Sequence, residues 1–466
     1  MSGCDLFVSD GKRDSSAEPD EIVRIDPDPF PSTYEPMPSK PVLITGATVL
    51  TGTGERLENG HVLMKDGKIV SVGAGADAPE LPEGGVTVDG QGKWVTPGVI
   101  DIHSHLGVYP SPSMPATADG NEATAPVTAE VWAEHSVWTQ DPGFTRALAG
   151  GVTSLMILPG SANLFGGRSV TLKNVPARTV QGMKFPGAPY GLKMACGENP
   201  KRVYGGRKQA PSTRMGNMAG YRAAWADAQA YQRKWDAYYE AVENGEDAEP
   251  PARDLELDTL SAVLRGEIIV HMHCYRAEEM AAILDMAQEF GYRVSAFHHA
   301  VESYKVADIL AENDVCSAMW ADWWGFKLEA YDMVRENAPM VHAAGACAIV
   351  HSDSDVGIQR LNQEAAKTWA DGRKAGFDIP RAEAIAWITA NPARAMGIYE
   401  KTGSLESGKA ADVVLWDGDP FSVYTQAEHV YIDGALAYDR DDPKRSPRTD
   451  FEVGQHENAR TGGAGQ

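Results

Sequence analysis

Pairs of histidines stand at the ends of short apolar segments, and this pattern could bind a metal ion. His103 and His105 are separated by one residue, and side chains alternate along a strand, so the two imidazoles point the same way. Two imidazoles in this arrangement can bind a borderline cation such as Zn²⁺, although hydrogen-bonded core histidines would give the same pattern. Of the 12 histidines in the chain, seven fall at four such ends: His103 and His105, His271 and His273, His298 and His299, and His351. One shared metal centre would explain all four clusters together.

A lysine inside an apolar segment is a second candidate for this chemistry. Lys193 lies in the sequence Gly-Leu-Lys-Met-Ala, where an unpaired charge is costly to bury. One interpretation is a lysine that reaches the surface or forms an ion pair. The other is a lysine carbamylated by carbon dioxide, whose carbamate bridges two metal ions. Glu198, five residues further on, is the alternative bridging group.

Short apolar strands alternate with helical segments through the middle of the chain, which is typical of an α/β fold. Eight such strands over about 300 residues indicate a (β/α)8 TIM barrel or a doubly wound sheet. The first strand is not followed by Gly-x-Gly-x-x-Gly, which argues against the nucleotide-binding alternative. In a barrel, the histidine pairs would meet at the carboxyl ends of the strands, where active sites are built. The expected strands cover residues 99–105, 152–158, 191–195, 268–273, 293–299, 315–320 and 348–351, with another within 168–184.

Strands are also expected at both ends of the chain. Residues 41–48 and 61–73 alternate apolar and polar side chains around the turn signal Asp66-Gly67, and residues 413–416 and 429–438 repeat the pattern. We therefore expect a small β-sandwich formed by the N- and C-terminal segments, with the barrel inserted into it. The expected boundaries are a disordered tail over 1–38, sandwich segments over 39–97 and 398–440, the barrel over 98–397, and a second tail over 441–466.

Composition excludes several classes of partner. Asp and Glu number 65 against 42 Lys and Arg, a net charge of −23, which repels nucleic acid and anionic membranes. No apolar run is long enough for a transmembrane helix.

Five cysteines in a chain of this length do not suggest a disulfide framework. Ser2-Gly3-Cys4 resembles the end of a lipoprotein signal without its apolar region, so a lipid anchor at Cys4 is one interpretation.

Three segments resemble the amidohydrolase superfamily, in particular its imidazolonepropionase-related and Xaa-Pro dipeptidase-like branches. They are the segment from Val95 to His105, residues 389–395 and residues 403–413. The resemblance covers nearly the whole chain after residue 40. It implies a (β/α)8 barrel with a mononuclear or binuclear metal site, in which Lys193 matches the bridging lysine of binuclear members. The ligand positions that it implies are His103, His105, His273, His299 and Asp353.

The resemblance implies a metal-dependent hydrolase that cleaves a carbon–nitrogen bond through metal-bound hydroxide. Asp353 would take the proton of the attacking water and pass it to the leaving nitrogen. We expect a small amide substrate such as a dipeptide or an N-acyl amino acid. Two alternatives remain: a cyclic-amide or lactone hydrolase that uses the same centre, and a non-catalytic scaffold on the same fold.

Four residues in expected mouth loops are candidates for substrate binding. Arg276 could pair with a substrate carboxylate, with a surface salt bridge as the alternative. It also occupies the place where deaminases and imidazolonepropionases are expected to carry Glu, which argues against both activities. Trp323 belongs to an aromatic loop that could form a pocket wall or pack on the rim. Tyr109 and Tyr204 follow the first and fourth strands.

The remaining expectations concern the metal, the assembly and the location. Zn²⁺, as one or two ions, suits imidazole and carboxylate ligands, and Mn²⁺ or Fe²⁺ would also fit. Related barrels often pair, so we expect a homo-oligomer. The chain would work in the periplasm or cell envelope if Cys4 is a lipoprotein cysteine, and in the cytoplasm otherwise.

Overall fold

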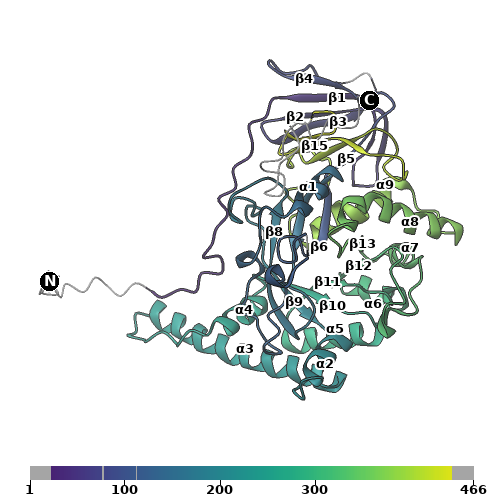
Figure 1. The fold of residues 1–466 in the computed structure, drawn as a ribbon. Coiled ribbons are helices and arrows are strands. Elements are labelled where there is room, and N and C mark those ends of the chain that lie inside the picture. Colours follow the sequence, from purple (N-terminus) through teal and green to yellow (C-terminus); the bar gives the residue numbers. More distant parts are fainter. Residues whose placement is uncertain (1–21, 76–77, 112, 443–466) are drawn as a thin grey trace, which may run out of the picture.

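The computed structural model describes residues 22–75, 78–111 and 113–442, which form two sheets with helices around the second (Figure 1). Cys4 and the segment 443–466 lie outside the described residues. The first sheet combines strands from both ends of the chain, and the second holds the strands of the middle. In the view of Figure 1 the terminal sheet lies at one end of the molecule, and helices α2 (Glu198–Gly205) and α3 (Arg214–Glu243) lie at the other.

The terminal sheet has the order β16-β15-β14-β5-β1-β2-β3, and β4 pairs with β1. Strand β5 joins the two ends of the chain, because it pairs in parallel with β1 and antiparallel with β14. The predicted hairpin at Asp66-Gly67 is present, and Asp433-Gly434 closes a second one between β15 and β16, with positive φ at each turn residue. All these strands belong to one hydrogen-bonded sheet, so the predicted sandwich is not confirmed. The strands are β1 (Val42–Leu50), β2 (Arg56–Lys65), β3 (Lys68–Ala74), β4 (Val86–Asp89), β5 (Trp94–Pro97), β14 (Val413–Trp416), β15 (Ala427–Ile432) and β16 (Ala435–Asp439).

The second sheet is curled and mostly parallel, and it follows chain order from β13 back to β6. Its strands are buried on both faces, as in α/β proteins whose sheets are covered by helices. One strand departs from a regular (β/α)8 pattern: β8 runs antiparallel to both neighbours. The closed barrel therefore stays a prediction, while a mixed α/β fold with this sheet fits it. The strands are β6 (Val99–Ser104), β7 (Val152–Ile157), β8 (Phe165–Lys173), β9 (Gly191–Ala195), β10 (Ile269–His273), β11 (Val294–His298), β12 (Cys316–Met319) and β13 (Ala348–Val350).

Helices follow most strands of this sheet. The long helix α3 buries Tyr221, Trp225, Tyr231, Trp235 and Tyr238, whose spacing places them on one apolar stripe. Helices α2, α3 and α4 lie between β9 and β10. The other helices are α1 (Pro142–Ala149), α4 (Leu255–Leu264), α5 (Ala277–Phe290), α6 (Ala307–Glu312), α7 (Asn337–Ala343), α8 (Leu361–Lys374), α9 (Arg381–Ala384) and α10 (Ala390–Ala395).

The two edge strands of the curled sheet, β6 and β13, are joined by hydrogen bonds beyond their ends. The backbone N–H of Asp353 donates to the carbonyl of His103 at 3.0 Å. The buried carboxylate of Asp101 accepts from the backbone N–H of Ser352 at 3.2 Å and from the Ser352 hydroxyl. These contacts bring the segment after β13 against the strand that carries His103 and His105.

Residues 22–38 contact the folded body, which differs from the prediction of a disordered tail. The backbone N–H of Val23 donates to the Tyr238 hydroxyl at 3.1 Å, and that of Thr33 donates to the Gln181 carbonyl at 3.0 Å. Tyr34 donates to Asp433 at 2.6 Å, which ties this segment to the terminal sheet. Among the described residues, no helix has the length and apolar character needed to cross a membrane.

Two disulfides correct the expectation drawn from the cysteine count. Cys196 pairs with Cys274, and Cys316 pairs with Cys347. Each bond joins two neighbouring parallel strands at residues that are in register. His273 pairs with Ala195 directly before the first bond, and Ser317 pairs with Ala348 directly after the second. Spacing along the chain cannot show this pairing, because it depends on which strands become neighbours.

Candidate metal centre

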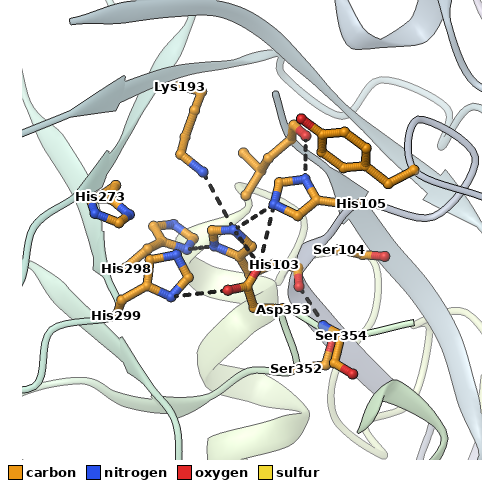
Figure 2. A network of polar contacts seen from close by, with 12 residues as sticks. His103, Ser104, His105, Lys193, His273, His298, His299, Ser352, Asp353 and Ser354 are labelled. Atoms are coloured by element: carbon orange, nitrogen blue, oxygen red, sulfur yellow. Dashed lines mark hydrogen bonds and ion pairs between the residues drawn. The ribbon is translucent and has the colours of Figure 1, made fainter. Parts of the chain in front are cut away.

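His103, His105 and Asp353 converge at the carboxyl end of β6 (Figure 2). The two Nε2 atoms are 3.3 Å apart, and they lie 3.6 Å and 3.3 Å from Asp353 Oδ1. Tetrahedral Zn²⁺ with ligand bonds of about 2.0–2.1 Å needs ligand atoms about 3.3–3.4 Å apart. The three donor atoms therefore fit three corners of a tetrahedral site. Asp353 has a φ of 50° and His299 a φ of 57°, left-handed conformations that are uncommon for non-glycine residues.

Lys193 points into the same site from β9. Its Nζ lies 3.4 Å from His103 Nε2, and the side chain is fully buried. Burial lowers the pKa of Lys193 to about 7, so a large share of the amine is neutral near neutral pH. A neutral amine is the form that reacts with carbon dioxide. Glu198, the alternative bridging group, lies at the start of α2, and its Oε1 is 3.9 Å from Lys327 Nζ.

His273 and His299 form the other side of the site. Their ring centroids are 4.8 Å apart, and His299 Nδ1 is 3.7 Å from Asp353 Oδ2. The Nδ1 atoms of both are buried and have no hydrogen-bond partner among the described residues. Burial holds the pKa of each imidazole well below its usual value. Both are therefore neutral near pH 7, which is the form that binds a metal ion.

His271 and His298 form a series of contacts with His103 that the sequence did not predict. His298 Nδ1 lies 2.7 Å from His103 Nδ1, and His298 Nε2 lies 3.0 Å from His271 Nδ1. A histidine that binds a metal through one ring nitrogen usually uses the other nitrogen to fix its orientation. The adjacency of His298 to His299 marked the cluster, but its contact with His103 depends on how the sheet curls.

His351 adds a further buried imidazole to the site. Neither ring nitrogen has a hydrogen-bond partner in the described part of the chain, and one nitrogen is within 4.8 Å of donor atoms of both His103 and His299. Its side chain is 1% exposed, and burial lowers its pKa to about 3. The site thus holds more neutral donors than one tetrahedral ion requires.

A cavity of about 650 Å³ opens beside these residues. Trp323 lines it and stacks on Trp320 with ring centroids 5.8 Å apart. Trp320 in turn stacks on His299 at 4.4 Å. The lining comprises Ser161, Asn199, His273, Tyr275, His299, Trp320, Asp322, Trp323, Trp324, Phe326, Lys327 and Asp353.

The other three candidates for substrate binding lie elsewhere. Tyr109 packs edge-on against His105 with ring centroids 5.6 Å apart, so it borders the site. Arg276 forms an ion pair with Glu278 at 2.5 Å and is not among the residues that line the cavity. Tyr204 is buried, and its hydroxyl donates to the carbonyl of Ala125 at 2.6 Å. The structure therefore brings Trp323 and Tyr109 to the site, and it does not bring Arg276 or Tyr204 there.

The chain is similar to a known family and to named proteins of that family. The Amidohydrolase family matches residues 94–447. The chain is 34% identical over 431 residues to Amidohydrolase tasK of Hapsidospora irregularis, which covers 86% of this chain and 43% of that protein. It therefore spans less than half the length of that relative. An imidazolonepropionase of Mesorhizobium japonicum is 26% identical over 395 residues, 80% of this chain and 90% of that protein.

Solved structures give the same result for the fold. An amidohydrolase from Thermotoga maritima has a TM-score of 0.77 and 34% identity, and the match covers 86% of this chain and all of that one, 100%. A prolidase complexed with N-methylphosphonate-L-proline has a TM-score of 0.51 and 18% identity, over 86% of this chain and 100% of the other. At that identity the likeness concerns the fold alone.

Proposed function

Because this chain belongs to the amidohydrolase family and is a hydrolase of carbon–nitrogen bonds, we propose that it cleaves the amide bond of a small substrate such as a dipeptide or an N-acyl amino acid. One observation carries the proposal. The donor atoms of His103, His105 and Asp353 lie 3.3–3.6 Å apart, beside a cavity of a size that suits a small molecule.

The residues that would hold a divalent metal ion are His103, His105 and Asp353, with His273 and His299 for a second ion. A bound ion supplies Lewis acidity and lowers the pKa of a water molecule toward about 7. Zn²⁺ suits this donor set. Lys193, buried and with a lowered pKa, would bridge two ions as its carbamate.

Asp353 is the chain's own group for proton transfer. Its carboxylate lies between the imidazoles and the cavity, with the side chain 24% exposed, so it can contact both water and substrate. It accepts the proton of the attacking water through a carboxylate oxygen and then donates that proton to the leaving nitrogen. The buried imidazoles stay neutral and hold the site in place.

Metal analysis and a substrate screen test this proposal. The purified protein is analysed for divalent metals, stripped with a chelator and reloaded with Zn²⁺, Mn²⁺ or Fe²⁺. Hydrolysis is then measured on dipeptides and N-acyl amino acids, with lactones and cyclic ureas as the competing classes. We expect activity on the first group that is lost in the stripped protein and regained on reloading. Activity confined to lactones or cyclic ureas would contradict the proposal and favour a cyclic-amide or lactone hydrolase.

The two disulfides support a further proposal on location. Disulfides persist in oxidising compartments and are rare in the cytosol, so Cys196–Cys274 and Cys316–Cys347 favour a site such as the periplasm or cell envelope. Alkylation of the denatured protein, taken from its native cell without reductant, should leave these four cysteines unmodified. Complete alkylation of all four would place the protein in a reducing compartment.

A further inference from the structure

The cavity beside the metal centre contains the positive charge of Lys327, which no sequence pattern indicated. Lys327 follows β12 and lines the cavity together with His273 and Asp353. Its side chain is 19% exposed, and its Nζ lies 4.2 Å from the centroid of the Tyr275 ring. Tyr275 packs edge-on against His273 at 4.6 Å. The ammonium group is therefore held within the cavity rather than in open solvent.

Lys327 is also joined to the metal centre through one side-chain amide. Its Nζ donates to Asn199 Oδ1 at 3.0 Å, and Asn199 Nδ2 lies 3.4 Å from His273 Nε2. A group of the substrate that contacts Lys327 would therefore lie one side chain, that of Asn199, away from His273.

The protein does not fully neutralise this charge. The acidic partner of Lys327 is Glu198, whose Oε1 is at the outer limit of an ion pair, 3.9 Å away. Glu329, the next acidic neighbour, pairs with Arg214 and accepts from the backbone of Glu198. Burial lowers the pKa of Lys327, which shows that its charge is poorly solvated. A substrate carboxylate at ordinary hydrogen-bond distance would satisfy it better than Glu198 does.

An apolar wall runs beside this charge. Trp320 and Trp323 stack outward from His299, and Trp320 meets Phe326 edge-on at 5.6 Å. Trp323 is 39% exposed and Phe326 is 57% exposed, so their rings offer surface to a ligand. Exposed aromatic groups gathered around a cavity are typical of a binding site.

We propose that Lys327 binds the carboxylate of the substrate while Trp323 and Phe326 contact an apolar or aromatic group, so that the enzyme selects N-acyl amino acids or dipeptides with a free carboxylate and an apolar side chain. This inference rests on the proposed function, because it assigns the substrate class of that same site. It also differs from the expectation for Arg276, whose guanidinium pairs with Glu278.

A binding measurement tests the subsite without requiring turnover. The probes are 3-phenylpropanoate and the neutral 3-phenylpropanamide, titrated by calorimetry into the metal-loaded protein. We expect the anion to bind more tightly than the amide, and Lys327→Met to weaken binding of the anion by about tenfold or more, because it removes a charge-assisted hydrogen bond. The amide should change little. Lys327→Arg should retain most of the affinity, and Glu198→Gln should increase it.

Lys374→Met is the matched control, because it removes the same charge from an exposed lysine of α8. Trp323→Ala should weaken both probes alike, since both carry the phenyl group. The inference is overturned if Lys327→Met leaves the affinity for 3-phenylpropanoate unchanged, or if the native protein binds the two probes equally.

Kinetics separate this inference from the proposed function. Acetate release is measured from N-acetyl-phenylalanine and from N-acetyl-2-phenylethylamine, which lacks only the carboxylate. We expect Lys327→Met to raise KM for the first by about tenfold and to leave the second unchanged. Absence of hydrolysis in the native protein with every amide would refute the proposed function and leave the binding result to stand alone. Equal loss on both substrates would refute the carboxylate subsite and leave the hydrolase intact.

Discussion

The proton positions along three buried histidines follow from the role of His103. If its Nε2 faces the metal position, its proton is on Nδ1 and donates to His298 Nδ1, 2.7 Å away. The proton of His298 is then on Nε2, which donates to His271 Nδ1 at 3.0 Å. The proton of His271 is left on Nε2, which has no partner among the described residues. The series thus holds His103 in the tautomer that presents a lone pair to the site.

Removing His298 should therefore weaken metal binding although it is not a predicted ligand. We expect His298→Ala to lower the affinity for Zn²⁺ by about 10–100-fold, because His103 loses the contact that orients its ring. His271→Ala should have a smaller effect, since His271 contacts His298 and not His103. Competition with a chromogenic chelator measures both. His342→Ala, at a histidine paired with Glu383, is the control. Equal affinities in the His298 variant and the control would contradict this account.

Replacing Asp353 should separate metal binding from proton transfer. We expect Asp353→Asn to retain metal, because the histidines remain and the amide oxygen can still coordinate, and to lower kcat by about 10²–10⁴-fold, the usual contribution of a general base. Metal content by mass spectrometry and steady-state kinetics on the best substrate of the screen give the two values. A variant that turns over like the native enzyme would show that Asp353 is not the base, whereas one that loses its metal would show that the carboxylate is needed to hold the ion.

At the scale of elements, the place of the histidines at strand ends could be predicted, because the short apolar strands are visible in the sequence. Residues 99–105 were expected as a strand and β6 covers Val99–Ser104, while residues 191–195 match β9. The antiparallel direction of β8 was missed because this strand was expected within 168–184. It begins at Phe165, after a loop that is too short for the crossover that a parallel neighbour needs. Lys327 was missed because it lies in a loop, and packing of the loop against Tyr275 sets its position.

The junction between β6 and β13 should contribute measurably to stability. Ser352→Ala removes the hydroxyl that donates to the buried Asp101 carboxylate. We expect a loss of about 1–3 kcal/mol in the free energy of unfolding, because a buried acceptor loses a partner. Chemical denaturation of the metal-free protein measures this loss without a contribution from metal binding. Ser407→Ala, at an exposed serine, should change stability little. A Ser352 variant as stable as this control would indicate that other contacts hold the junction.

At the scale of the whole molecule, one disulfide lies at the carboxyl ends of the strands of the curled sheet and the other lies at their amino ends. Cys196 and Cys274 follow β9 and β10, and Cys274 comes directly after His273. Cys316 begins β12 and Cys347 precedes β13, at the amino ends of those strands and away from the metal centre. The candidate ligands could be picked out from the sequence, but this cross-link could not, because the spacing of cysteines shows neither the order nor the register of the strands.

The two disulfides should therefore affect stability alike and the site differently. Replacing either pair by alanine should lower the free energy of unfolding by about 2–5 kcal/mol, since each closes a loop in the unfolded chain, of 78 residues in one case and 31 in the other. Only loss of the Cys196–Cys274 bond should also weaken Zn²⁺ binding, by about tenfold, because it frees the chain beside His273. Denaturation without reductant and chelator competition measure the two effects, with the Cys316–Cys347 variant as the matched control. If both variants bind Zn²⁺ like the native protein, the bond beside His273 acts on folding alone, and the ligands must be held by the sheet and the buried histidines.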